Sequence, residues 1–184
     1  MATLVNQDVS IRHLAEGELP LLEQMYESFA PRHAAMGLPP EERCRRRAWL
    51  ENLVHGMNLV AVRGARIAGH LALMPCGRAA EMAVFVHQDF RRQGIGTALT
   101  RAAMEEAGRL GIRLVWVLVS SENFIALNGL RRMGFHIAWE SMGEVQLVYR
   151  LAPATEAADG ARNGKELAGC DTLAPARSPT LPAR

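Results

Sequence analysis

Apolar and polar positions along residues 1–151 switch repeatedly between the period of a strand and that of a helix. Arg113–Val119 is almost continuously apolar, as expected of a strand buried on both faces. Glycines mark two hairpin turns, at Gly64 and Gly143, and a helix end at Gly134. The predicted strands are Val9–Leu14, Met57–Val62, Ile67–Met74, Ala79–His87, Arg113–Val119, Phe135–Ser141 and Val145–Leu151, and the predicted helices are Glu16–Phe29, Pro39 to about His55, Gly94–Leu110 and Glu122–Met133.

The resulting order, β-α-α-β-β-β-α-β-α-β-β, predicts a mixed α/β (α+β) fold. Hairpins at both ends of the chain should pair antiparallel, and Gly94–Leu110 should form a right-handed crossover between two parallel strands. We therefore expect a single domain over residues 1–151. Its central sheet should be mostly antiparallel, with one parallel β-α-β unit and helices on its flanks.

Residues 152–184 have a different composition. They contain no aromatic residue, four prolines and four charges of each sign. Such a segment buries too little apolar surface to offset the entropy of ordering it. We predict a disordered C-terminal tail.

Charge and composition exclude several function classes. The 21 basic and 19 acidic residues nearly balance, and only 5% of residues are aromatic, so nucleic acid is not an expected partner. The run Arg43–Arg47 is interpreted as a solvated helix face, because Glu41 and Glu42 stand four residues before Arg45 and Arg46. The longest apolar run, Leu114–Val119, is too short to span a membrane.

Three cysteines are too few and too widely spaced for a disulfide framework, and none stands at metal-ligand spacing. We expect Cys44 and Cys76 to be small buried residues, no metal, and a reducing, cytoplasmic location. The N-terminus has no basic stretch followed by an apolar run, so no signal peptide is predicted.

The most informative segment lies where the strand Ala79–His87 ends and a helix begins. The turn between them contains two arginines and two glycines, in the order Arg91-Arg92-Gln93-Gly94-Ile95-Gly96. The first N–H groups of a helix lack partners and carry partial positive charge, and glycines let a ligand approach them closely. Such a turn predicts a diphosphate site. A third glycine is missing at Leu99 and no Gly-Lys-Ser/Thr is present, which disfavours dinucleotide and P-loop folds.

At these residues the sequence resembles the GNAT superfamily of acyl-CoA N-acyltransferases. That family's Arg/Gln-x-x-Gly-x-Gly/Ala motif stands at Arg91–Gly96, and its second motif resembles Asn123–Ala126 followed by Gly134-Phe135. The resemblance covers about Val9 to Leu151. A narrower similarity, to bacterial Pat-type protein lysine acetyltransferases, rests on a strand carrying a glutamate, a second motif without tyrosine, and a helical insert.

The resemblance implies acetyl-CoA as cosubstrate and no metal. It implies that the backbone of Val84, Phe85 and Val86 binds the pantetheine arm. It further implies that the turn from Arg91 to Thr97, namely Arg91, Arg92, Gln93, Gly94, Ile95, Gly96 and Thr97, holds the pyrophosphate. Asn123 would lie near the thioester; alternatively, Asn123 only caps its helix.

An amine must lose its proton before it can be acylated, so a general base is expected. Glu81 is the candidate, because an acid in an apolar strand is costly to bury and the resemblance places a base on this strand. A solvent-facing Glu81 is the alternative, and His87 is expected at the surface. The tyrosine that often protonates the departing thiolate in the family is replaced by Leu130.

The predicted function is acetyl transfer from acetyl-CoA to a primary amine by direct attack in a ternary complex. A protein lysine is one acceptor that the resemblance implies. A small amine, a peptide N-terminus, or a non-catalytic acyl-CoA sensor are the alternatives. The sequence leaves the oligomeric state open, a homodimer included.

Overall fold

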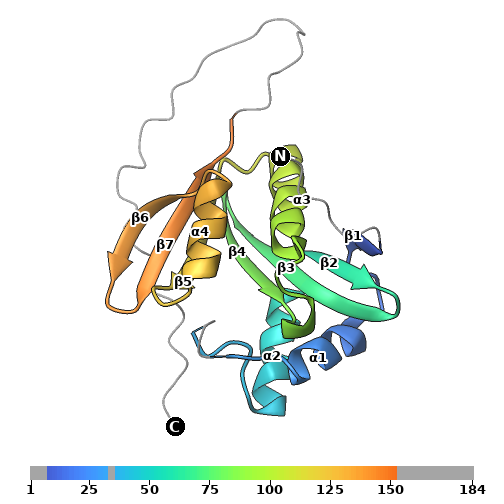
Figure 1. The fold of residues 1–184 in the computed structure, drawn as a ribbon. Helices are drawn as coiled ribbons and strands as arrows, with labels where there is room; N and C mark the ends of the chain where they lie inside the picture. The colour runs from blue at the N-terminus through green and yellow to red at the C-terminus, as the bar shows by residue number, and fades with distance from the viewer. Residues whose placement is uncertain (1–7, 33–35, 153–184) are drawn as a thin grey trace, which may run out of the picture. The chain divides into compact units, whose positions relative to one another are not determined.

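The structure, a computed structural model, describes residues 8–32 and 36–152. Seven strands form one sheet of order β1-β2-β3-β4-β5-β7-β6 (Figure 1). The strands are β1 (Val9–His13), β2 (Met57–Arg63), β3 (Arg66–Cys76), β4 (Ala79–Val86), β5 (Leu114–Ser120), β6 (His136–Ser141) and β7 (Glu144–Arg150). The helices are α1 (Leu19–Glu27), α2 (Arg43–Leu53), α3 (Ile95–Arg109) and α4 (Phe124–Arg132), with a 3-10 turn, η2, at Gln88–Phe90.

The predicted mixed fold is confirmed. Neighbouring strands pair antiparallel except β4 and β5, which run parallel and are joined through α3. The order of strands and helices also agrees with the prediction. The predicted tail lies outside the described residues except for Ala152, so the domain boundary stays a prediction.

The predicted start of the second helix at Pro39 is wrong. α2 begins at Arg43, and its N-cap residue Glu42 has an extended backbone. The buried guanidinium of Arg46 donates to the carbonyls of Pro40 and Glu41 at 3.2 and 2.8 Å. These two carbonyls thus have hydrogen-bond partners without being part of a helix. The expected Glu42–Arg46 pair is therefore absent, and Glu42 pairs with Arg45 at 3.0 Å.

Alternating strand residues build two separate clusters on opposite faces of β2–β4. On one face, α3 packs against residues such as Leu59, Leu71 and Leu73. On the other, α1 covers Val60 and Phe85, and α2 adds Leu50. This part of the sheet is thus covered by helices on both sides (Figure 1).

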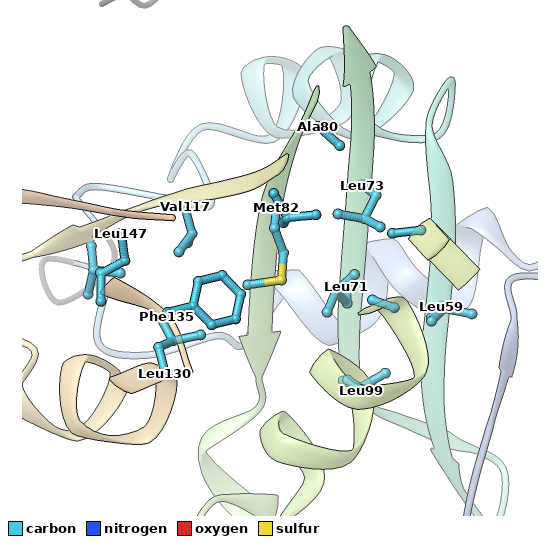
Figure 2. Close-up of a cluster of buried hydrophobic side chains, with 14 of the residues drawn as sticks. Leu59, Leu71, Leu73, Ala80, Met82, Leu99, Val117, Leu130, Phe135 and Leu147 are labelled. Atoms are coloured by element: carbon cyan, nitrogen blue, oxygen red, sulfur yellow. The ribbon is translucent and has the colours of Figure 1, made fainter. Parts of the chain in front are cut away.

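The half of the sheet formed by β5–β7 is covered on one face. Leu130 of α4 and Phe135 pack beside Val117 and Leu147, next to Met82 of β4 (Figure 2). The opposite face presents Trp116 and Leu118 of β5, together with Val148 of β7. These three side chains are half-buried and are not members of either cluster formed by the described residues. No helix in the described part of the chain has the length and apolar character needed to span a membrane.

Candidate active site

β4 and β5 pair over only three residues. Ala79–Glu81 oppose Leu114–Trp116, whereas the rest of β4 pairs with β3 alone. The ladder ends at the Glu81–Trp116 pair, and Figure 1 shows β4 and β5 diverging. The edge of β4 that would continue the ladder therefore presents backbone groups of Val84 and Val86 toward the gap, and the C=O of Val86 accepts from Arg91 Nε at 3.0 Å. The backbone of Phe85, also predicted to bind the pantetheine arm, faces β3 instead, because alternate residues of a strand point to opposite edges and His87 N–H on the same side donates to Ala68 C=O at 2.9 Å. Such an edge can hydrogen-bond an extended ligand.

The turn after β4 presents a run of backbone donors. Arg92 and Gly94 have left-handed backbones, with φ of 63° and 79°, and the first helical bond runs from Ala98 N–H to the C=O of Gly94 at 3.0 Å. No acceptor among the described residues takes the N–H groups of residues 93–97. These donors, at the positive end of α3, can bind an anion.

The two neighbouring arginines of the turn have different surroundings. Arg91 is half-buried and donates to protein carbonyls, and burial lowers the pKa of its guanidinium. Arg92 is exposed and lines a cavity of about 370 Å³. The other residues lining this cavity are Phe124, Ile125, Asn128 and Arg132, all from α4. Arg132 was not among the site residues predicted from the sequence. The signal available for it was a basic residue in the last turn of the helix after Asn123.

The remaining residues of the turn support its shape. The side chain of Gln93 accepts from Arg63 at 3.3 Å and so points toward β2. Ile95 is buried and anchors α3 in the core. A Cβ on Gly96 would lie 3.5 Å from Val86 Cγ2, so a larger side chain there would fill the space between the turn and β4. Thr97 is half-exposed on the first turn of α3.

Glu81 lies where β4 and β5 separate. It stands opposite Met74 of β3 and Trp116 of β5, and it is half-buried. Desolvation raises the pKa of its carboxyl above the usual 4.5. A carboxylate with a raised pKa next to an open face is suited to accept a proton near neutral pH.

Asn123 caps α4, with its Oδ1 accepting the N–H of Ala126 at 3.2 Å. The capping role considered as an alternative is therefore realised. Leu130, at the position of the family's tyrosine, is 5% exposed and belongs to the larger cluster, so it offers no proton.

Two buried histidines were not anticipated. His87, expected at the surface, is 3% exposed: Nδ1 accepts the N–H of Asp89 at 3.3 Å and Nε2 lies 3.0 Å from Ser28 Oγ. The reason is that His87 caps η2 and closes β4 onto the end of α1.

The second histidine, His70, is fully buried, and burial lowers its pKa to about 3. Its Nδ1 lies 2.7 Å from the Tyr26 hydroxyl and its Nε2 lies 2.8 Å from Asn58 Oδ1. Asn58 in turn donates to the carbonyls of Leu53 and Gly56 at 3.1 and 2.8 Å. A neutral ring that accepts from Tyr26 and donates to Asn58 satisfies this chain, which joins α1, β3, β2 and the end of α2.

The expectation of buried cysteines is wrong. Cys44 and Cys76 are both exposed. Cys44 stands two residues before the buried Arg46 and therefore lies on the opposite, outer side of α2. Cys76 ends β3, beside the turn at Gly77. Within the described ranges, no group of three His, Cys, Asp or Glu side chains could hold a metal ion.

Comparison with known proteins gives one family match. The model of the Acetyltransferase (GNAT) family matches residues 22–135. An uncharacterized N-acetyltransferase of Methanocaldococcus jannaschii is 40% identical over 68 residues, which are 37% of this chain and 30% of that protein. The chain thus matches less than a third of the length of that relative.

Solved structures show the same fold. The GNAT domain of S. lividans PAT has a TM-score of 0.67 at 17% identity, with 78% of this chain and 90% of that chain covered. The ribosomal-protein-S18-alanine N-acetyltransferase of Escherichia coli gives 0.65 at 18% identity, covering 83% and 99%. The spermidine N-acetyltransferase of Vibrio cholerae, solved with CoA and spermine, gives 0.64 at 15% identity, covering 79% and 96%.

Proposed function

Because the chain belongs to the acetyltransferase (GNAT) family, we propose that it transfers an acetyl group from acetyl-CoA to a primary amine. One observation carries the proposal. The N–H groups of residues 93–97 have no acceptor among the described residues. They follow β4, whose edge beyond Glu81 is not paired with β5. A ligand with a diphosphate followed by an extended amide chain fits both features.

Binding would be divided between backbone and side chains. The turn offers its amide hydrogens and the exposed Arg92 to the diphosphate, and Arg132 supplies a second cation on the same cavity. Val84 and Val86 offer the open edge of β4 to the pantetheine arm. Phe124 and Ile125, 68% and 69% exposed, give that cavity an apolar side. These residues fit acetyl-CoA as cosubstrate.

Acetyl-CoA supplies the acetyl group as an activated thioester. In the proposed step the neutral amine forms the new C–N bond, the C–S bond breaks, and CoA leaves as the thiolate. Glu81 accepts the proton of the amine, directly or through water. Since Leu130 cannot donate, the thiolate leaves as the anion or takes its proton from water; a thiol pKa near ~8.5 permits this.

We propose a protein lysine as the acceptor. The face next to Glu81 is a strip of half-buried apolar side chains, Trp116, Leu118 and Val148, with Trp139 43% exposed on the neighbouring β6. A partly exposed apolar strip suits a polypeptide better than a small polar amine, which is better held in an enclosed polar pocket. A polyamine and a peptide α-amino group are the competing acceptors.

Calorimetric titration with acetyl-CoA tests the cosubstrate. We expect saturable heat with the wild type and none with Gly96→Trp, whose side chain fills the space next to Val86. Gly108→Ala, at the far end of α3, is the matched control: its Cβ would lie 3.8 Å from Leu151 Cδ2, an ordinary contact, so the variant should fold and retain binding. No heat with the folded wild type would refute the proposal.

Release of CoA, detected with a thiol reagent, tests the acceptor. The panel contains a lysine peptide with a blocked N-terminus, a peptide whose only amine is its N-terminus, and spermidine. The chain contains a single lysine, Lys165, outside the described residues, so acetylation of enzyme lysine is readily separated by mass spectrometry. Turnover of the blocked lysine peptide is expected. Binding of acetyl-CoA without turnover of any acceptor would favour the sensor hypothesis.

A further inference from the structure

The segment that follows α1 is bound to the end of β4 by side chains of η2 and of the residues on either side of it. Gln88 makes two bonds to it: Oε1 accepts the N–H of Ala30 at 3.0 Å, and Nε2 donates to the C=O of Ser28 at 2.6 Å. His87 Nε2 lies 3.0 Å from Ser28 Oγ. Arg91 Nη2 donates to the C=O of Ala30. We call these contacts of Ser28–Ala30 with His87, Gln88 and Arg91 the clasp.

Arg91 has its guanidinium committed to the clasp. Nε donates to the C=O of Val86 at 3.0 Å, and the cation lies 5.2 Å from the centre of the Phe29 ring. Two of its five N–H groups thus donate to carbonyls, and the cation packs against one ring. The neighbouring Arg92 points instead into the cavity shared with α4.

We propose that Arg91 is a positioning residue, not a ligand of the diphosphate, and that the clasp couples cosubstrate binding in the turn to the segment after α1. The inference rests on the proposed acetyl-CoA site. Arg91 stands two residues before the donors of the turn, so a ligand that fixes those donors also fixes the backbone that carries the guanidinium. Gln88 and Arg91 both hydrogen-bond Ala30, so ordering the backbone that carries Arg91 also orders Ala30. By reciprocity, order in Ser28–Ala30 favours the binding-competent turn.

Hydrogen–deuterium exchange with and without CoA tests the coupling. In the wild type, CoA should slow amide exchange in two places: residues 93–97, and residues 28–30 on the other side of the clasp. In Gln88→Ala and in Arg91→Ala, the slowing at 93–97 should persist and that at 28–30 should be lost. Gln88 does not belong to the turn, so its variant reports on the clasp alone and decides the matter if Arg91→Ala does not fold.

The salt dependence of CoA affinity separates positioning from direct contact. A cation that contacts a phosphate contributes a salt-screened attraction, so its removal should flatten the dependence of Kd on ionic strength. We expect flattening with Arg92→Ala and an unchanged slope with Arg91→Ala. Equal flattening in both variants would make Arg91 a diphosphate ligand and overturn the inference.

The failures of the two proposals are distinguishable. A folded wild type that binds no CoA refutes the proposed function. A wild type that binds CoA, with slowed exchange at 93–97 and unchanged exchange at 28–30, refutes the coupling alone.

Discussion

The two halves of the sheet differ in how their faces are used. β2–β4 are buried on both faces, with α3 on one and α1 and α2 on the other. β5–β7 are buried against α4 on one face and present half-buried Trp116, Leu118 and Val148 on the other. Glu81 and Trp116 form the last pair that joins the halves. The candidate base therefore lies at the border between a packed scaffold and an open surface.

The largest effect is expected at that border. Glu81→Gln should lower kcat by about 10²–10⁴-fold near neutral pH, because the neutral amide cannot accept a proton. Activity of the wild type should fall as pH drops through the carboxyl pKa, which desolvation raises above 4.5, since only the ionised form is a base. Steady-state rates from pH 5 to 9 check this, with the acetyl-CoA Kd as control. An unchanged pH–rate profile in Glu81→Gln would remove Glu81 as the base.

Paired truncations measure the difference between the halves directly. Leu22 of α1 is fully buried, so Leu22→Ala should lower the free energy of unfolding by about 2–5 kcal/mol. Leu118→Ala, which removes the same atoms from a half-buried position, should cost less than about 1 kcal/mol. Urea denaturation of both variants gives the comparison. Equal losses would mean that the β5 face is packed in solution.

The packed half should also be the acid-sensitive half. His70 binds a proton at pH 6.5 when unfolded and only at about 3 when folded, so the unfolded state binds more protons between these values. Stability from this group is complete above pH 6.5 and falls by up to about 1.4 kcal/mol per pH unit below it. Urea unfolding at pH 7, 6 and 5 should show this slope. His70→Gln, which cannot titrate, should have lower stability at pH 7 and a reduced slope; a wild-type slope in this variant would contradict the assignment.

The smallest effect on stability is expected on the open half. Trp139→Ser should change the free energy of unfolding by less than about 0.5 kcal/mol, because the indole is exposed on an edge strand. If a polypeptide acceptor docks on this face, the same variant should raise the KM of the lysine peptide several-fold and leave the KM of spermidine unchanged. Equal changes for both acceptors would argue against peptide docking.

Periodicity and glycine positions were enough to predict the element order and the single parallel crossover. They failed where side chains from distant segments decide the local structure. Arg46 turns inward and donates to the carbonyls that precede α2, so the helix begins later than its predicted start. His87 is buried because Ser28 lies beside it, 59 positions earlier in the chain. Local patterns carry no information about such contacts.

The candidate site was predicted in the same uneven way. The turn and Glu81 could be proposed from the sequence because their signals are contiguous: a glycine spacing and an acid in an apolar strand. The different surroundings of Arg91 and Arg92 could not be predicted in this way, since they depend on the contacts of Arg91 with Ala30 and Val86. Arg132 joins the cavity only through the placement of α4.

The short pairing of β4 with β5, only three residues long, affects how acceptor preference can change. The half-buried side chains on the face of β5 and β7 away from α4 should contribute less to folding than those of β2–β4, so they should vary with a smaller loss of stability. The proposed proton acceptor, Glu81, and the proposed diphosphate turn belong to β4 and the start of α3. Selection for a new acceptor can therefore act on one half of the sheet while the acetyl donor chemistry is inherited unaltered in the other.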